Sequence, residues 1–176
     1  MSPRWLRLAI RLLAVAGAIY TLVRTLAARM CTVEVAGGSM TPTLTSGEYL
    51  LLRRGPPPNG SAARGLIVAA HGPDGRLLLK RIVGVPGDSL RVGEHVFVNG
   101  ALLVEPYAHG SAAPAQYRGV HRLEPHQYFL LGDHRTASTD SRDFGPVAVG
   151  AIVGVAWLRY WPPARVGLLD RAGDRG

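Results

Sequence analysis

Residues 77–88 read LLLKRIVGVPGD, and this stretch says most about the fold. The aliphatic and β-branched side chains over 77–85 predict a strand. Pro86-Gly87-Asp88 then predicts a tight turn, because proline presets one backbone angle and glycine permits the next. The segment therefore indicates a β domain with a lysine inside an apolar strand.

Lys80 is the only lysine in the chain, since 19 of the 20 basic residues are arginine. On a strand, Lys80 shares a face with Leu78 and Ile82, whereas Arg81 points to the other face. To be neutral near pH 7, Lys80 needs its pKa lowered by roughly 3.4 units from about 10.4, and burial can supply such a shift. A guanidinium cannot lose its proton in this way. We interpret Lys80 as a candidate general base, and the alternative is an edge-strand lysine whose ammonium reaches water.

The chain after Met30 shows a pattern of short strands and turns, which predicts a mostly-β fold. Asn99-Gly100, between two apolar segments, is a strong signal for a β-hairpin. Loops are expected over 55–65, 105–119 and 132–146. The loop over 105–119 is expected to be mobile. The expected strands are 32–35, 48–53, 66–70, 77–85, 96–98, 101–104, 127–131 and 147–160, the last bent at Gly150 or Gly154.

The first 30 residues predict a membrane anchor. An apolar run over 12–23 spans about 18 Å as a helix, less than the roughly 30 Å hydrocarbon core, so the segment is counted from Trp5. Arg24 stands where small residues would precede a cleavage site, which favours an anchor over a cleavable signal peptide. A buried core helix is the third interpretation. Three arginines before the run and two after it favour a cytoplasmic N-terminus, with the following domain on the extracytoplasmic side.

Composition narrows the possible functions. The net charge of +8 comes from arginines spread along the chain, without a basic block interleaved with aromatics, so nucleic-acid binding is not expected. The charge fits an anionic membrane surface better. A single cysteine excludes a disulfide within the chain, and the six histidines show no metal-ligand spacing. We therefore expect neither a metal nor a small-molecule cofactor.

Two further segments are candidates for the chemistry. Residues 37–44 read GGSMTPTL, and the two glycines allow Ser39 to lie on an exposed turn with its N–H free, which suits a nucleophile. Residues 132–146 read GDHRTASTDSRDFGP, a polar loop that could fold over a site. The alternatives are a glycine-rich turn for the first segment and a solvated turn for the second.

The three segments, in this order, resemble the signature boxes of bacterial type I signal peptidases. The S-M-x-P-T-L box matches 39–44 and the K-R-x-V-G-x-P-G-D box matches 80–88. The G-D-N-R-x-x-S-x-D-S-R box matches 132–142, with His134 in place of the usual Asn. The spacing is similar to that of the compact, Gram-positive-like members. The resemblance implies a membrane anchor over 1–30, a mostly-β, barrel-like serine peptidase domain over 31–161 and a C-terminal tail over 162–176, which is expected to be poorly ordered.

The resemblance also implies a role for each matched residue. Ser39 is expected to be the nucleophile, Lys80 the general base, and Ser138 the residue that orients Lys80. Gly37 lacks the hydroxyl that some members use as an oxyanion donor, but Gram-positive members also carry glycine there. Supporting positions beside the site are expected at Met40, Gly38, Arg81, Asp133, Asp140 and Arg142, with Arg81 paired with Asp133 and Asp140 paired with Arg142.

The implied function is a membrane-bound serine endopeptidase that removes signal peptides from secreted preproteins after small residues in an Ala-X-Ala pattern. Its expected partners are these preproteins and the phospholipid membrane. Two alternatives remain open from the sequence. One is a specialised maturation protease for a single dedicated precursor. The other is a catalytically inactive, membrane-tethered β domain that binds peptides, although such a domain would be expected to lose Ser39, Lys80 or Ser138.

Overall fold

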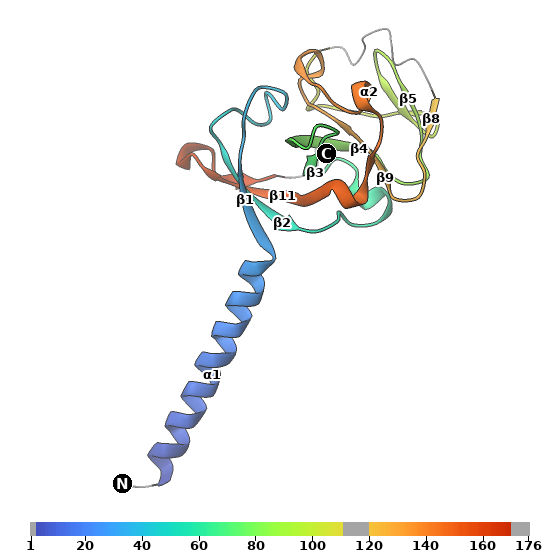
Figure 1. Ribbon diagram of the computed structural model, residues 1–176. Coiled ribbons are helices and arrows are strands. Elements are labelled where there is room, and N and C mark those ends of the chain that lie inside the picture. The colour runs from blue at the N-terminus through green and yellow to red at the C-terminus, as the bar shows by residue number, and fades with distance from the viewer. Residues whose placement is uncertain (1–2, 111–119, 170–176) are drawn as a thin grey trace.

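The computed structural model describes residues 3–110 and 120–169, a long helix joined to a β domain (Figure 1). The helix is α1, Pro3–Ala28. The strands are β1 Met30–Glu34, β2 Tyr49–Arg54, β3 Ile67–His71, β4 Leu77–Gly84, β5 Ser89–Val92, β6 Val96–Val98, β7 Ala101–Leu102, β8 Val120–Arg122, β9 Gln127–Leu131, β10 Val147–Ala148, β11 Ile152–Trp161 and β12 Gly167–Leu168. The short helical segments are η1 Gly60–Ala63, η3 Arg135–Ala137, α2 Ser141–Phe144, η4 Val149–Ala151 and η5 Pro163–Arg165.

Helix α1 projects away from the β domain (Figure 1). Its large apolar side chains are exposed along its length. Residues Trp5–Ala28 have a mean hydropathy of 1.8, and none of this helix is buried against the rest of the protein. By length and composition the helix can cross a membrane. A buried core helix, one of the sequence-based interpretations, is therefore wrong.

The β domain contains two sheets. The larger, eight-stranded sheet follows the order β1-β2-β11-β3-β4-β9-β10, with β12 added to β11. The smaller, four-stranded sheet follows the order β7-β6-β5-β8. The mostly-β fold with one N-terminal apolar helix is confirmed. Among the described strand pairings the path of the larger sheet is open, because β1 and β10 are its ends rather than neighbours.

Strand β4 lies between two apolar clusters, which explains its composition. Ile82 packs on one face with residues of β3 and β9. Val83 packs on the other face against residues of the small sheet. A strand covered on both faces is apolar at successive positions rather than at alternate ones. Lys80 and Arg81 interrupt this strand with two consecutive charges that are both buried.

The structure corrects several sequence-based expectations. The expected strand 147–160 is divided into β10 and β11 by the helical turn η4, which contains Gly150. The expected loop 132–146 contains η3 and α2, and strands β5 and β8 were not expected. Residues 105–110 are held by contacts described below, whereas 111–119 lie outside the described residues.

The tail from Pro162 was expected to be poorly ordered, and the structure corrects this expectation as far as residue 169. Strand β12 pairs with β11, and Arg165 donates to Thr45 Oγ1 at 3.0 Å. Arg165 also forms an ion pair of 2.8 Å with Glu48, which is 1% exposed. A buried carboxylate needs such partners, so this part of the tail packs as an element of the domain. Residues 170–176 lie outside the described residues.

Candidate functional site

Ser39 lies on a turn whose backbone conformation is fixed by the residues before and after it. Gly37 adopts a left-handed backbone with φ of 81°, a conformation that favours glycine. Thr41 closes the turn, because its backbone N–H and its hydroxyl both donate to the Gly38 carbonyl, at 3.1 and 2.8 Å. Met40 is 1% exposed and packs in the apolar cluster below. The turn therefore presents Ser39 at the surface while its neighbours are anchored.

Lys80 contacts Ser39 directly. The Lys80 Nζ and Ser39 Oγ lie 2.7 Å apart, although the two residues are 41 positions apart in the chain. Lys80 is 3% exposed in strand β4. As an ammonium, Lys80 donates to Ser39 Oγ, and as a neutral amine it can accept the hydroxyl proton across the same distance. The sequence-predicted pair is thus brought together.

Burial lowers the pKa of Lys80 below its ordinary value. Desolvation is the largest cause, and the positive charge of Arg142 acts in the same direction. The carboxylates of Asp140, Asp133 and Asp143 oppose the shift, since a nearby negative charge favours the ammonium. The net direction leaves a larger fraction of Lys80 neutral near pH 7 than of an exposed lysine, and only the neutral amine can accept a proton.

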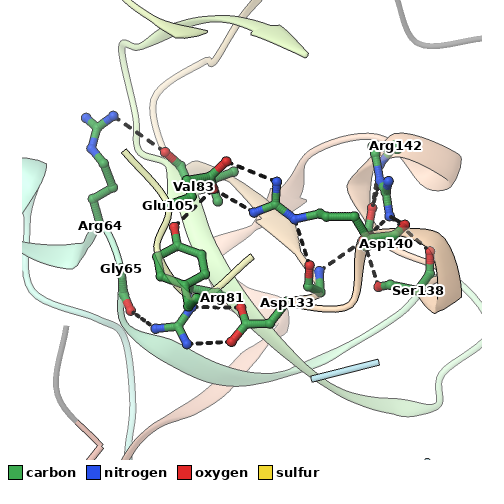
Figure 2. A network of polar contacts seen from close by, with 12 residues as sticks. Arg64, Gly65, Arg81, Val83, Glu105, Asp133, Ser138, Asp140 and Arg142 are labelled. Carbon is green, nitrogen blue, oxygen red and sulfur yellow. Dashed lines mark hydrogen bonds and ion pairs between the residues drawn. The ribbon is translucent and has the colours of Figure 1, made fainter. Parts of the chain in front are cut away.

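Asp140 connects the parts of the loop that lies beside Lys80 (Figure 2). Its carboxylate forms a buried ion pair with Arg142, with Arg142 Nε 2.8 Å from Asp140 Oδ1. The same carboxylate accepts from the Gly132 N–H at 3.0 Å and from the Ser138 hydroxyl at 2.7 Å. Asp140 is also the N-cap of α2. One buried carboxylate therefore fixes both ends of the segment 132–142.

Ser138 makes different contacts from those that the resemblance implies. Its hydroxyl donates to Asp140, and its carbonyl accepts from Arg142 at 3.2 Å. Within the described residues, the hydrogen bond of Lys80 Nζ is with Ser39. In this conformation Ser138 bonds to Asp140, and the negative charge of Asp140 raises the pKa of Lys80 against the effect of burial. A direct Ser138–Lys80 bond stays a prediction.

Arg81 forms the second expected ion pair, with Asp133 (Figure 2). As the next residue of β4 after Lys80, Arg81 directs its side chain to the other face of the strand. Its Nε and Nη2 donate to Asp133 at 2.8 and 2.6 Å, a bidentate pair with both side chains buried. Its Nη1 donates to the Gly65 carbonyl at 2.7 Å. The Tyr107 ring covers the guanidinium, 4.0 Å from ring centroid to carbon. These contacts bury the guanidinium of Arg81, which is 1% exposed, and hold it in one position.

Glu105 ties the Tyr107 segment to the loop beside the site (Figure 2). It accepts from the Tyr107 hydroxyl at 3.0 Å and from both terminal nitrogens of Arg135, at 3.0 and 2.6 Å. Burial raises the pKa of Tyr107, so its phenol stays protonated and able to donate. The Arg135 Nε in turn donates to the Gly132 carbonyl at 2.9 Å. Residues 105–110 are therefore part of the structure that supports the site.

His134 holds the nucleophile turn from the other side. Its backbone N–H donates to the Ser39 carbonyl at 3.0 Å, and its Nδ1 lies 3.0 Å from Thr41 Oγ1. Because the Thr41 hydroxyl donates its proton to Gly38, the Nδ1 of His134 is the donor to Thr41. The departure from the usual Asn therefore keeps a side-chain donor at this position.

A narrow cleft of about 90 Å³ extends from Ser39 and Lys80 between β1 and β4. Residues 33–37 and 77–80 form its two rims. Among the described residues, strand β1 pairs only with β2, and the pairing of β4 with β9 begins at Arg81. In the strand pairings that the structure describes, both rims therefore have a backbone edge without a neighbouring strand.

Sequence reasoning missed four residues that shape this site: Tyr107, Glu105, Gly132 and Thr41. Tyr107 and Glu105 lie in a segment rich in Gly, Ala and Pro, which carries no local signal of packing. Gly132 begins the third signature box, and its position there was the available signal.

Across residues 3–110 and 120–169, no group of three or more His, Cys, Asp or Glu side chains could hold a metal ion.

Comparison with known proteins places the chain in a family. The model of the signal peptidase family, peptidase S26, matches residues 4–161. A probable signal peptidase I-2 of Synechocystis is 36% identical over 149 residues, covering 80% of this chain and 67% of the relative. Signal peptidase I of Bacillus caldolyticus is 35% identical over 141 residues, covering 73% of this chain and 78% of the relative.

A crystal structure of a signal peptidase I from Enterococcus faecalis is similar to 56% of this chain and 98% of its own, with 26% identity and a TM-score of 0.46. The family match over 4–161 is decisive, and the chain belongs to the peptidase S26 family of signal peptidases. It is a serine endopeptidase of this family, with an N-terminal helix that makes it membrane-anchored.

Proposed function

We propose that the protein removes signal peptides from secreted preproteins, with Ser39 as the nucleophile and Lys80 as the general base. The 2.7 Å contact between Lys80 Nζ and Ser39 Oγ carries this proposal. The names of its relatives, signal peptidase I, supply the class of substrate. The proposed location is a single pass through the cell membrane, with the N-terminus cytoplasmic and the β domain on the extracytoplasmic side.

The proposed reaction proceeds through an acyl-enzyme. Neutral Lys80 takes the proton of the Ser39 hydroxyl as Oγ attacks the scissile carbonyl carbon. The Ser39 backbone N–H has no acceptor within the described residues, so it is available to stabilise the oxyanion. Lys80 gives the proton to the leaving amine when the C–N bond breaks. It then takes a proton from the water that attacks the ester carbon, and returns this proton to Ser39 Oγ when the ester C–O bond breaks, which frees the hydroxyl of Ser39.

The cleft supports a substrate with small side chains near the scissile bond. Its volume of about 90 Å³ is well below the 300 Å³ or more of a common small-molecule pocket. The unpaired edges of β1 and β4 can each accept an extended peptide through backbone hydrogen bonds. An extended peptide directs alternate side chains to the same side. Both Ala side chains of an Ala-X-Ala segment would therefore point the same way, which fits a requirement for small residues at these two positions.

The substrate class is tested with a preprotein that carries Ala-X-Ala before its cleavage site. The solubilised full chain is expected to release the mature fragment when the last residue is Ala, Gly or Ser, and to cleave much more slowly when it is Leu or Trp, because a cleft of about 90 Å³ favours a small side chain at this position. Equal cleavage of the Ala and Trp substrates would contradict the role of the cleft. If folded protein leaves several unrelated preproteins uncut, the dedicated-precursor alternative takes first place.

The pH dependence of the reaction should report the proton on Lys80. Because only the neutral amine can accept a proton, kcat/KM is expected to rise with pH as Lys80 deprotonates. Burial lowers the pKa of Lys80, so the midpoint should lie below the value of about 10.4 for an exposed lysine. The measurement is kcat/KM on a peptide substrate between about pH 5 and pH 11.5, with the folded fraction followed at each pH. A midpoint at or above the ordinary lysine value would contradict the proposed base.

A further inference from the structure

Four arginines that the proposed peptidase chemistry does not use lie in or next to the ends of α1 and β2. Figure 1 shows that these two elements come together where the helix meets the β domain. Arg24 and Arg29 belong to the end of the helical segment, and Arg53 and Arg54 end strand β2. Pairing of β1 with β2 joins the two segments, because Met30 pairs with Arg53 and the Arg54 N–H donates to the Arg29 carbonyl at 2.8 Å. We call these four residues the arginine collar.

The charges of the collar have no carboxylate partner within the described residues. All four arginines are exposed. Arg53 donates to the Pro56 carbonyl at 3.3 Å, and Arg54 Nε donates to the Met30 carbonyl at 3.1 Å, contacts that leave both charges uncompensated. Seven other arginines of the described chain, in contrast, form ion pairs with Asp or Glu. The collar is therefore a local excess of positive charge.

The anchor helix sets the height of the collar. Arg11 and Arg24 are about 20 Å apart along a helix, whereas the hydrocarbon core is about 30 Å thick. A centred helix places the Cα of Arg24 about 5 Å inside the hydrocarbon, from where its side chain can reach the headgroups. Arg29 follows about 7 Å further along the axis, which is headgroup level. The contacts of Arg53 and Arg54 with residues 29 and 30 keep them close to that level.

We propose that the arginine collar is a binding site for the phosphate groups of anionic phospholipids. A guanidinium presents a fork of N–H donors that matches the oxygens of a phosphate. Several arginines at the depth of the lipid headgroups are therefore placed beside the phosphate groups of the lipids. The membrane supplies this ligand because α1 places the collar in it. Since β1 starts at the collar and forms one rim of the cleft, bound lipid would hold that rim at a fixed height above the bilayer.

The test measures lipid selectivity, which does not depend on peptidase activity. The full chain is placed in phosphatidylcholine bilayers that contain spin-labelled phosphatidylglycerol or spin-labelled phosphatidylcholine. The wild type is expected to bind the anionic lipid more tightly, and the preference should fall by up to about five-fold for each arginine removed. The collar variant Arg53→Gln/Arg54→Gln should show this loss, and salt of about 1 M should weaken the wild-type preference.

A matched variant distinguishes binding at the arginine collar from a general effect of the positive net charge of the protein. Arg91→Gln/Arg122→Gln removes the same charge from exposed positions on β5 and β8, in the small sheet. It should keep the wild-type preference. Inorganic phosphate at millimolar concentration should not compete, since the proposed ligand is a lipid in the bilayer. No preference in the wild type, or equal losses in the two Gln pairs, would overturn the proposal, and unchanged thermal unfolding shows that each variant is folded.

Discussion

Lys80→Arg is expected to abolish cleavage of a preprotein while the protein stays membrane-anchored and folded. Arginine keeps the positive charge, but its guanidinium cannot give up a proton in a protein. It therefore cannot take the proton of the Ser39 hydroxyl, and we expect kcat/KM to fall by roughly a thousandfold or more, as when other serine peptidases lose their base. Ser39→Ala should cause a similar loss, and the double variant should be no worse than either, because the two residues act as one unit.

Two controls make this result specific. Lys80 is 3% exposed, so the larger arginine could disturb packing, and Lys80→Met provides a variant of similar length without a charge. If both variants unfold at the wild-type temperature and neither cleaves, the loss belongs to the chemistry. Arg76→Lys, at an exposed position of the loop before β4, should cleave normally. Normal cleavage by Lys80→Arg would mean that another group is the base.

The strands could largely be predicted from the sequence, for a physical reason. Alternation and turn residues are local signals, and β2, β3, β4 and β9 begin within a residue or two of their predicted positions. Strands β5 and β8 were missed because they are short and rich in charged or polar residues. The division of 147–160 was missed because the apolar run continues through η4, where the backbone leaves the sheet.

The site could be predicted only where a motif carries it. Ser39 and Lys80 lie in signature boxes, and their contact agrees with the expected pair. The stacking of Tyr107 on Arg81 joins residues 26 positions apart, in a segment whose composition suggested a mobile loop. Likewise, nothing in the sequence around Arg165 or around Glu48 indicates that the two residues form an ion pair. Such contacts depend on tertiary structure, which single-residue patterns do not encode.

Gly132→Ala should produce the second large loss of activity, through position rather than chemistry. A Cβ at residue 132 would lie 2.6 Å from the Ser39 carbonyl oxygen and 2.5 Å from Ser138 Cβ. Real Cβ atoms do not approach this closely, and the Ser39 oxygen belongs to the backbone of the nucleophile turn. Either the turn or the loop from Gly132 to Asp140 must therefore move, and with it the 2.7 Å contact between Ser39 and Lys80.

A displacement of about 1 Å at a nucleophile can cost roughly a hundredfold in rate, so we expect kcat to fall by about that factor. Gly150→Ala is the matched control, because its Cβ would meet nothing within 4 Å and its backbone is not left-handed. It should cleave at the wild-type rate. Since the Gly132 N–H also donates to buried Asp140, thermal unfolding separates misplacement from instability. A stable Gly132→Ala enzyme with wild-type kcat would show that Ser39 and Lys80 tolerate a shift of this loop, and that the close packing of residues 39, 132 and 138 is not needed for the reaction.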